Sequence, residues 1–534
     1  MLLLIFGWQP IVLNAQSGTP SSEQVKKQAN WQNADLKKNK KNGVSTDKAY
    51  DELLKGKAST PIIVAVIDGG VDIYHEDLKD VIWTNTKEIP DNGIDDDNNG
   101  YIDDIHGWSF LGIGKKGSVD KENLELAREY GRLRKKFGNR NKASITSDEE
   151  SDYKYFQVVK EDFTSKYDLA ERMCKNIKKN IESWEESTLE VKKYLNKDTL
   201  TIKDVKSMNA PEGSSVKQSA DFLLQNMEHG MNLVVLQAAY SYFEDQLKYD
   251  LNPDCDSRKA VGDDPDNFKD IRYGNNDVKG SHPDHGTMVA GLIAAKRNNN
   301  IGMNGVADNV KIMPILVVPD GDERDKDVAL AIRYATDNGA KIINMSFGKN
   351  YSPNKKEVMD AMEYAVAHNV LLVHAAGNES KSNDTAMSYP SPYINKTSNI
   401  IPSFIEVGAS TMYKNKKLPA SFSNYGATTV DIFAPGEDIY TTYPENAYEI
   451  ASGTSFSSPV VAGVAALILS YYPTLTAKQV KEVIIASGVS FAGKKVLRPC
   501  EGGKAPKIKF GQLSISGKVV NVYNALKLAE TYAK

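Results

Sequence analysis

A short stretch toward the C-terminal end of the chain, ASGTSFSSPV from Ala451 to Val460, is rich in hydroxyl side chains. A serine hydroxyl becomes a nucleophile when a neighbouring base takes its proton, and that base works best when a third group fixes its tautomer. Two other stretches offer such groups. His285 begins the small-residue run HGTMVAGLIAA, which is typical of a helix packed closely against a sheet. Asp68 ends the apolar run IIVAVID, which is typical of a buried strand.

Each of these residues also has an ordinary explanation, as a helix cap or a turn. In the order aspartate, histidine, serine, however, VAVIDGGVD, HGTMVAG and GTSFSSPVVAG resemble the three motifs of the subtilisin-like serine peptidases, the subtilases. The segments NMSFG, AAGN, FSNYG and APG add to the resemblance, which covers roughly residues 58–112 and 281–530. Residues between the aspartate and histidine motifs fall outside it.

The resemblance implies a serine endopeptidase that cleaves polypeptides through an acyl-enzyme. Ser455 matches the nucleophile, His285 the general base and Asp68 the orienting carboxylate. Asn378, in HAAGNES, matches the asparagine that stabilises the oxyanion, together with the backbone N–H of Ser455. The resemblance also implies a pocket for a substrate side chain and an extended segment that pairs with the substrate backbone. These would be formed by Ser346, Phe347, Gly348, Ala375, Ala376 and Gly377.

The stretch DNGIDDDNNGYIDD concentrates carboxylates around two glycines. Carboxylates this dense repel one another, and a hard cation such as Ca²⁺ would relieve the repulsion. The spacing follows the first part of a calcium-loop register, although the glutamate expected at the end of that register is replaced by His106. We therefore predict a structural Ca²⁺ and no organic cofactor, with a solvated acidic loop as the alternative. The candidate ligands are Asp95, Asp97, Asn99 and Asp103.

The elements that must position these residues alternate along the chain. After Gly280, strand-like runs such as VKIMPILVV and VLLVHAAGN alternate with helical segments such as DKDVALAIRYATDNG. This pattern predicts an α/β fold with a doubly wound, mostly parallel sheet in a three-layer α/β/α arrangement. Residues 58–113 and 281–534 would form its two parts. Between them, Lys- and Glu-rich residues 114–280 carry apolar residues at helical spacing, which predicts a mainly helical insertion.

The N-terminal sequence MLLLIFGWQPIVLNAQSG has an apolar stretch too short and too interrupted by proline to be a stable membrane anchor. We read residues 1–15 as a signal peptide and residues 16–57 as a leader, which predicts a secreted or periplasmic protein without a membrane span in its mature form. The leader is too short for a full-sized inhibitory propeptide. The sequence therefore does not indicate how maturation of the protein is controlled.

Composition excludes some classes of function. The chain has 534 residues, a net charge of −4 and 25% charged residues, so it lacks the basic surface expected of a nucleic-acid-binding protein. The three cysteines, Cys174, Cys255 and Cys500, lie far apart without a CxxC pair, which argues against a zinc site and leaves their disulfide state open. The oligomeric state is equally open.

Two alternatives to a peptidase remain at this stage. A peptide ligase or cyclase would share the acyl-enzyme, and an insertion that excluded water from the cleft would favour it. An inactive binding protein would use the helical insertion and keep the peptidase fold as a scaffold. The complete set of catalytic motifs argues against the second alternative.

Overall fold

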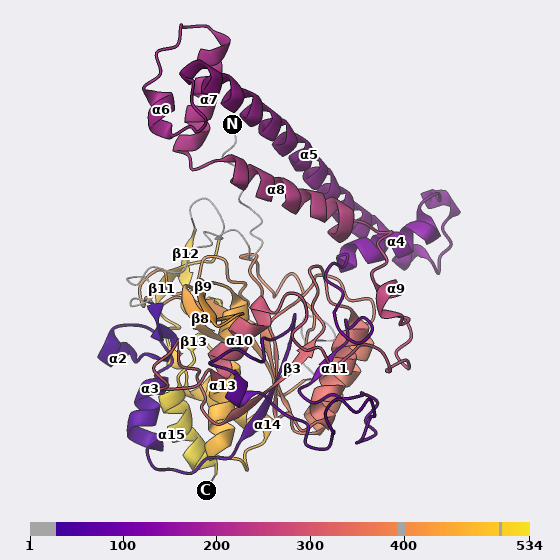
Figure 1. The fold of residues 1–534 in the computed structure, drawn as a ribbon. Coiled ribbons are helices and arrows are strands. Elements are labelled where there is room, and N and C mark those ends of the chain that lie inside the picture. The colour runs from indigo at the N-terminus through magenta and orange to yellow at the C-terminus, as the bar shows by residue number, and fades with distance from the viewer. Residues whose placement is uncertain (1–27, 394–400, 501–504, 534) are drawn as a thin grey trace. The chain divides into compact units, whose positions relative to one another are not determined.

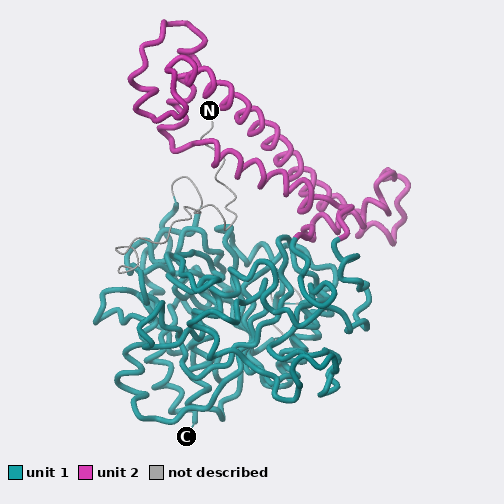
Figure 2. Tube along the Cα trace, in the orientation of Figure 1, with its two compact units in different colours: residues 1–120, 257–534 teal, residues 121–256 magenta. Residues whose placement is uncertain are grey.

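The computed structural model describes residues 28–393, 401–500 and 505–533. The chain divides into two compact units, of which the first comprises residues 1–120 and 257–534 and the second residues 121–256 (Figure 2). The predicted signal peptide lies outside the described residues. We describe each unit separately.

A nine-stranded sheet forms the centre of the first unit, in the order β10-β13-β7-β6-β5-β4-β1-β3-β2. Neighbouring strands are parallel except for β10 and β13. The predicted doubly wound, mostly parallel α/β fold is therefore confirmed. The strands are β1 (Ile62–Asp68), β2 (Trp108–Ser109), β3 (Val310–Leu316), β4 (Ile342–Met345), β5 (Leu371–Ala375), β6 (Phe404–Ser410), β7 (Ile432–Pro435), β10 (Val489–Ser490) and β13 (Lys518–Val519).

Helices cover both faces of this sheet (Figure 1). Along β1, Val64 and Val66 join one hydrophobic core and Ala65 and Ile67 join the other, as expected for a strand buried on both faces. The first core is completed by α10 (Asp284–Ala294), α13 (Thr454–Tyr471), α14 (Ala477–Ser487) and α15 (Val522–Tyr532). The second is completed by α11 (Asp325–Asp337) and α12 (Lys355–Ala367).

The central helix α13 is apolar around its whole circumference because it lies within the core. Among the described residues, it is the one helix long and apolar enough to cross a membrane, and 94% of it is buried inside the protein. The smaller elements of this unit are α2 (Leu36–Asn39), α3 (Thr46–Ala49), α9 (Arg258–Val261) and the hairpins β8 (Ile439–Tyr443) with β9 (Ala447–Ala451) and β11 (Lys495–Leu497) with β12 (Lys507–Lys509).

The described part of the predicted leader is folded onto the same core. Trp31, Val44 and Leu54 are buried in the cluster that also holds α13 and α15. The indole N–H of Trp31 donates to the carbonyl of Asp438. Residues 28–57 are thus packed into the first unit rather than forming a separate tail.

The second unit is helical and lies within the predicted insertion, whose outer residues 114–120 and 257–280 belong to the first unit. The 46-residue helix α5 buries the side chains whose helical spacing predicts it, among them Phe156, Phe163 and Trp184. Shorter helices pack along α5. The helices are α4 (Glu125–Phe137), α5 (Glu150–Leu195), α6 (Ile202–Lys206), α7 (Ser215–Glu228) and α8 (Leu233–Asp245).

Candidate active site

Asp68 and His285 form a hydrogen-bonded pair at the carboxyl end of β1. His285 lies in the first turn of α10, and its Nδ1 is 2.7 Å from Asp68 Oδ1. The same carboxylate oxygen accepts the backbone N–H of Gly69 at 2.8 Å. The Asp68 side chain is 2% exposed and that of His285 is 25% exposed. The carboxylate is therefore held inside the protein while the imidazole reaches the surface of a cleft.

A glycine permits this close approach of helix and strand. A Cβ atom on Gly286 would lie 2.1 Å from the carbonyl oxygen of Gly70 and 3.2 Å from Asp68 Cβ. Any larger residue at this position would push α10 away from the end of β1. The small residues of HGTMVAG thus decide the distance between His285 and Asp68.

Ser455 is the second residue of α13 and is 5% exposed. Its hydroxyl donates to the carbonyl of Ser346 at 3.1 Å. The Ser346 hydroxyl in turn lies 3.0 Å from the carbonyl of Ser455 and 2.9 Å from the hydroxyl of Ser458. Ser457 donates to the carbonyl of Ala434. Ser455 and Ser346 both line the same cleft as His285.

Asn378 follows β5 and its side-chain oxygen is fixed by Thr454. The backbone N–H and the hydroxyl of Thr454 donate to Asn378 Oδ1 at 2.8 and 3.0 Å. The hydroxyl of Thr454 also accepts the N–H of Gly377. Because Oδ1 is engaged by these donors, the NH₂ group of Asn378 is left to donate toward the cleft that it lines.

The cleft has a volume of about 650 Å³, a size that suits a ligand of several residues. Asp68, His285, Ser455 and Asn378 all line it. Of the six residues predicted to bind substrate, Ser346, Phe347, Gly348, Ala375 and Gly377 line it as well. Ala376 is fully buried behind this wall, and its carbonyl accepts the side-chain amides of Asn383 and Asn424.

The charge of Asp68 changes the proton affinity of His285. Burial lowers the pKa of this imidazole, but the adjacent Asp68 carboxylate outweighs burial, and the pKa is raised overall. Asp284 adds to the increase. A raised pKa makes the imidazole a stronger base, which is the property needed to deprotonate a serine hydroxyl.

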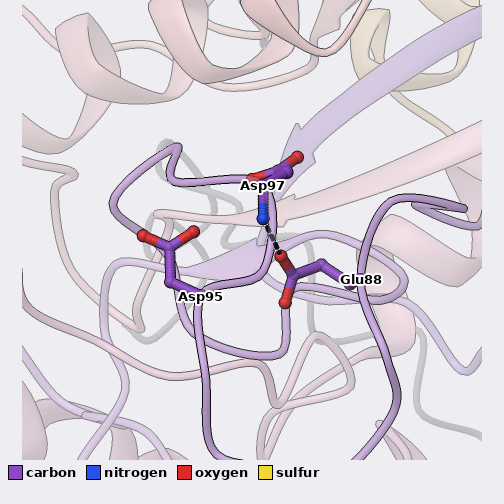
Figure 3. Close-up of side chains that lie close together, drawn as sticks. All are labelled: Glu88, Asp95 and Asp97. Atoms are coloured by element: carbon purple, nitrogen blue, oxygen red, sulfur yellow. Dashed lines mark hydrogen bonds between the residues drawn. The ribbon is translucent and has the colours of Figure 1, made fainter.

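The acidic loop brings together some of the predicted metal ligands but not all of them. Carboxylate oxygens of Glu88, Asp95 and Asp97 lie within 4.8 Å of one another (Figure 3). Asp103 is not in this cluster, and its carboxylate accepts the backbone N–H groups of Asn92 and Gly93. The backbone N–H of Asn99 donates to the carboxylates of Asp95 and Asp97, and its side-chain amide donates to Asp104.

Two residues of these sites are absent from the sequence-based prediction. Glu88 precedes the acidic stretch, and both of its carboxylate oxygens accept backbone N–H groups, of Asp97 and Asp103. Its proximity to the loop in sequence is the one signal that could have suggested it. Thr454, which orients Asn378, is adjacent to Ser455, and its hydroxyl could have been recognised as a candidate.

At the carboxyl end of a strand of the parallel sheet, a histidine base is held by a buried carboxylate. It shares a cleft with a serine at the start of a helix. With the chain order aspartate, histidine, serine, this arrangement places the protein in the class of serine-type peptidases. A family model described as the subtilase family matches residues 59–500. The chain belongs to the subtilase family.

The curated relatives align with only part of this chain. Subtilisin DY from Bacillus licheniformis is 42% identical over 200 residues, which are 37% of this chain and 67% of that protein. The thermophilic serine proteinase of Bacillus sp. strain AK1 is 40% identical over 220 residues, 41% of this chain and 49% of that protein. A solved protease from Pseudoalteromonas arctica PAMC 21717 is 27% identical, with a TM-score of 0.37, over 46% of this chain and 70% of that chain.

Proposed function

We propose that this protein is an exported endopeptidase that hydrolyses peptide bonds through an acyl-enzyme on Ser455. The observation that carries the proposal is the His285–Asp68 pair, which shares one cleft with Ser455 and Asn378. The apolar N-terminal stretch supports export. The test is cleavage of unfolded casein and labelling by a fluorophosphonate, both performed on the exported protein, whose N-terminal residue should be Gln16.

The first chemical step requires the hydroxyl of the nucleophile to change its hydrogen-bond partner. The hydroxyl of Ser455, which donates to Ser346 in the resting enzyme, turns toward His285 Nε2. His285 takes the proton as Oγ attacks the scissile carbonyl carbon, and Asp68 accepts the Nδ1–H bond and stabilises the imidazolium. Collapse of the tetrahedral intermediate expels the amine, which takes the proton from His285.

The second step repeats the same chemistry with water. His285 deprotonates a water molecule that attacks the acyl-enzyme, and the proton then returns to the Ser455 oxygen. In both steps the negative oxygen would accept hydrogen bonds from the Asn378 amide and the Ser455 N–H. The latter is at the positive end of α13. The segment containing Phe347 and Gly348 would pair with the substrate backbone.

Removing the amide donor should slow catalysis without preventing it. We expect Asn378→Ala to lower kcat by about 10²–10³-fold with little change in KM, because the amide contacts an oxygen that is charged mainly in the transition state. The measurement is steady-state hydrolysis of a chromogenic peptide. Asn383→Ala is unsuitable as a control because that side chain supports the cleft, but Asn415→Ala changes an exposed loop amide and should leave kcat unchanged. A KM effect alone would argue against the assigned role.

We also propose that Glu88, Asp95 and Asp97 bind a structural Ca²⁺. Three oxygen ligands from carboxylates match the chemistry that Ca²⁺ prefers. The ion would relieve the repulsion within the cluster and fix the loop between β1 and β2. None of its three ligands lines the cleft that holds Ser455 and His285. We therefore assign it a role in stability and no part in the chemical steps.

Calcium removal should lower the melting temperature of the protein. At a free Ca²⁺ concentration of 100 times Kd, binding to the folded state adds about 2.7 kcal/mol to the free energy of unfolding. A chelator should remove this contribution from the wild type but have little effect on Asp97→Asn. The matched control is Asp91→Asn, because Asp91 is exposed, lies outside the cluster and has a backbone φ of 59°, which asparagine tolerates. Equal melting temperatures of the wild type with and without chelator would contradict the proposal.

A further inference from the structure

A buried histidine lies directly beneath the segment proposed to bind substrate. His374 is on β5 and is fully buried. Its Nε2 is 2.8 Å from the carbonyl oxygen of Phe347, and its Nδ1 is 2.8 Å from Glu406 Oε2. Because a carbonyl oxygen only accepts, Nε2 must carry a hydrogen. The side chain of His374 thus donates a hydrogen bond that fixes the Phe347 carbonyl.

The partner of this histidine is a buried glutamate on the adjacent strand. His374 and Glu406 are register partners in the parallel pair β5–β6. The second oxygen of Glu406, Oε1, is 3.4 Å from Asn383 Nδ2, which also donates to the carbonyl of Ala376 at 2.9 Å. Glu406 therefore connects both walls of the predicted pocket: the Phe347 wall through His374 and the Ala376 wall through Asn383.

These side chains also lie next to the floor of the cleft. A Cβ atom placed on Gly348 would be 2.9 Å from Ser388 Oγ and 3.5 Å from His374 Nε2. A cavity of about 20 Å³, enough for one water molecule, is lined by Glu406, Asn383 and Ser388. Asn383 and Ser388 line the cleft as well. The glutamate is therefore separated from the cleft by a single layer of side chains.

Stability alone gives no reason for a buried ionisable pair at this place. Burial raises the pKa of Glu406, and the contact with His374 lowers it, but the pKa is raised overall. The ionised carboxylate is therefore costly to bury. Well-packed apolar residues are often at least as stabilising as a buried ion pair. What the polar network provides is direction: His374 donates to the Phe347 carbonyl in one wall, and Asn383 donates to the Ala376 carbonyl in the other.

We propose that Glu406, acting through His374 and Asn383, is a positioning residue that holds the two walls of the substrate pocket at a fixed separation. It thereby sets how strongly the pocket discriminates between large and small substrate side chains. This inference rests on the proposed function, because the pocket is assigned through the cleft that Ser455 lines.

The test compares two peptides that differ only at the residue whose carbonyl is attacked, Phe in one and Ala in the other. The readout is the ratio of their kcat/KM values. We expect Glu406→Ala to reduce this ratio by about 10-fold or more, because a pocket that no longer fits the ring loses discrimination of the size that apolar pockets provide. A purely structural defect would lower the amount of active enzyme and leave the ratio unchanged.

Glu406→Gln should retain the ratio and serves as the conservative variant. A neutral His374 with its proton on Nε2 still donates to Phe347, and its Nδ1 can accept the glutamine NH₂ group. The glutamine oxygen can then accept the amide of Asn383. Leu526→Ala, in the buried face of α15, is the control for general destabilisation: it should lower Tm without changing the ratio.

A second measurement separates this inference from the proposed chemistry. In the Ser455→Ala background, calorimetry gives the Kd of each peptide without hydrolysis. The same loss of discrimination on adding Glu406→Ala supports the inference, even if the parent enzyme hydrolyses neither peptide and the proposed function is wrong. An unchanged ratio of Kd values, or no binding of either peptide, overturns the inference.

Discussion

Replacement of Ser455 by alanine should lower kcat by about 10⁶-fold and abolish labelling by a fluorophosphonate. The alanine variant lacks the oxygen that attacks the carbonyl, while the His285–Asp68 pair and the cleft remain. Only solvent water can then react, with the residual help of the oxyanion donors. Casein cleavage and probe labelling, measured on the wild type and the variant side by side, give the result directly.

The matched control is Ser452→Ala. Ser452 belongs to the same hydroxyl-rich stretch, but its Oγ accepts the backbone N–H of Asp438 and it precedes α13. This variant should cleave and label like the wild type. Labelling of Ser455→Ala would show that another residue is the nucleophile. Labelling of the wild type without hydrolysis would instead indicate an acyl acceptor other than water, as in a ligase.

Replacement of Asp68 by asparagine should lower kcat by about 10⁴-fold. Asp68 Oδ1 accepts the Nδ1–H of His285, which leaves Nε2 free to take a proton. An asparagine can present its NH₂ group to Nδ1 and so favour the tautomer with hydrogen on Nε2. That tautomer cannot act as the base toward Ser455.

The same variant should change the pH dependence of the remaining activity. The imidazole must be neutral to act as a base, so wild-type activity is lost as pH falls through the raised pKa of His285. Removing the Asp68 charge lowers that pKa, and the acid limb of the kcat/KM profile should move to lower pH. Asp284→Asn should also move it downward while keeping kcat within about tenfold, because the tautomer is unaffected. An acid limb that moved upward in Asp68→Asn would contradict the assignment.

The sequence by itself determined the class of the fold and the members of the candidate catalytic set. Strands such as β1 are apolar on both faces, and helices such as α11 have a periodic apolar face, and both patterns are local properties of the chain. Asp68, His285 and Ser455 stand at the ends of such elements, within short motifs. The long helix α5 was predictable for the same reason, because its buried residues recur at helical spacing.

Only the tertiary structure decided which distant groups meet. Glu88 joins Asp95 and Asp97, whereas Asp103 does not, because the loop closes on itself through backbone hydrogen bonds that no residue spacing specifies. His374 meets Glu406 because β5 and β6 pair in one register, and a shift of one residue would turn both side chains to other neighbours. Register depends on the packing of whole strands between two helical layers, so the support beneath the substrate pocket could not be inferred from local sequence patterns.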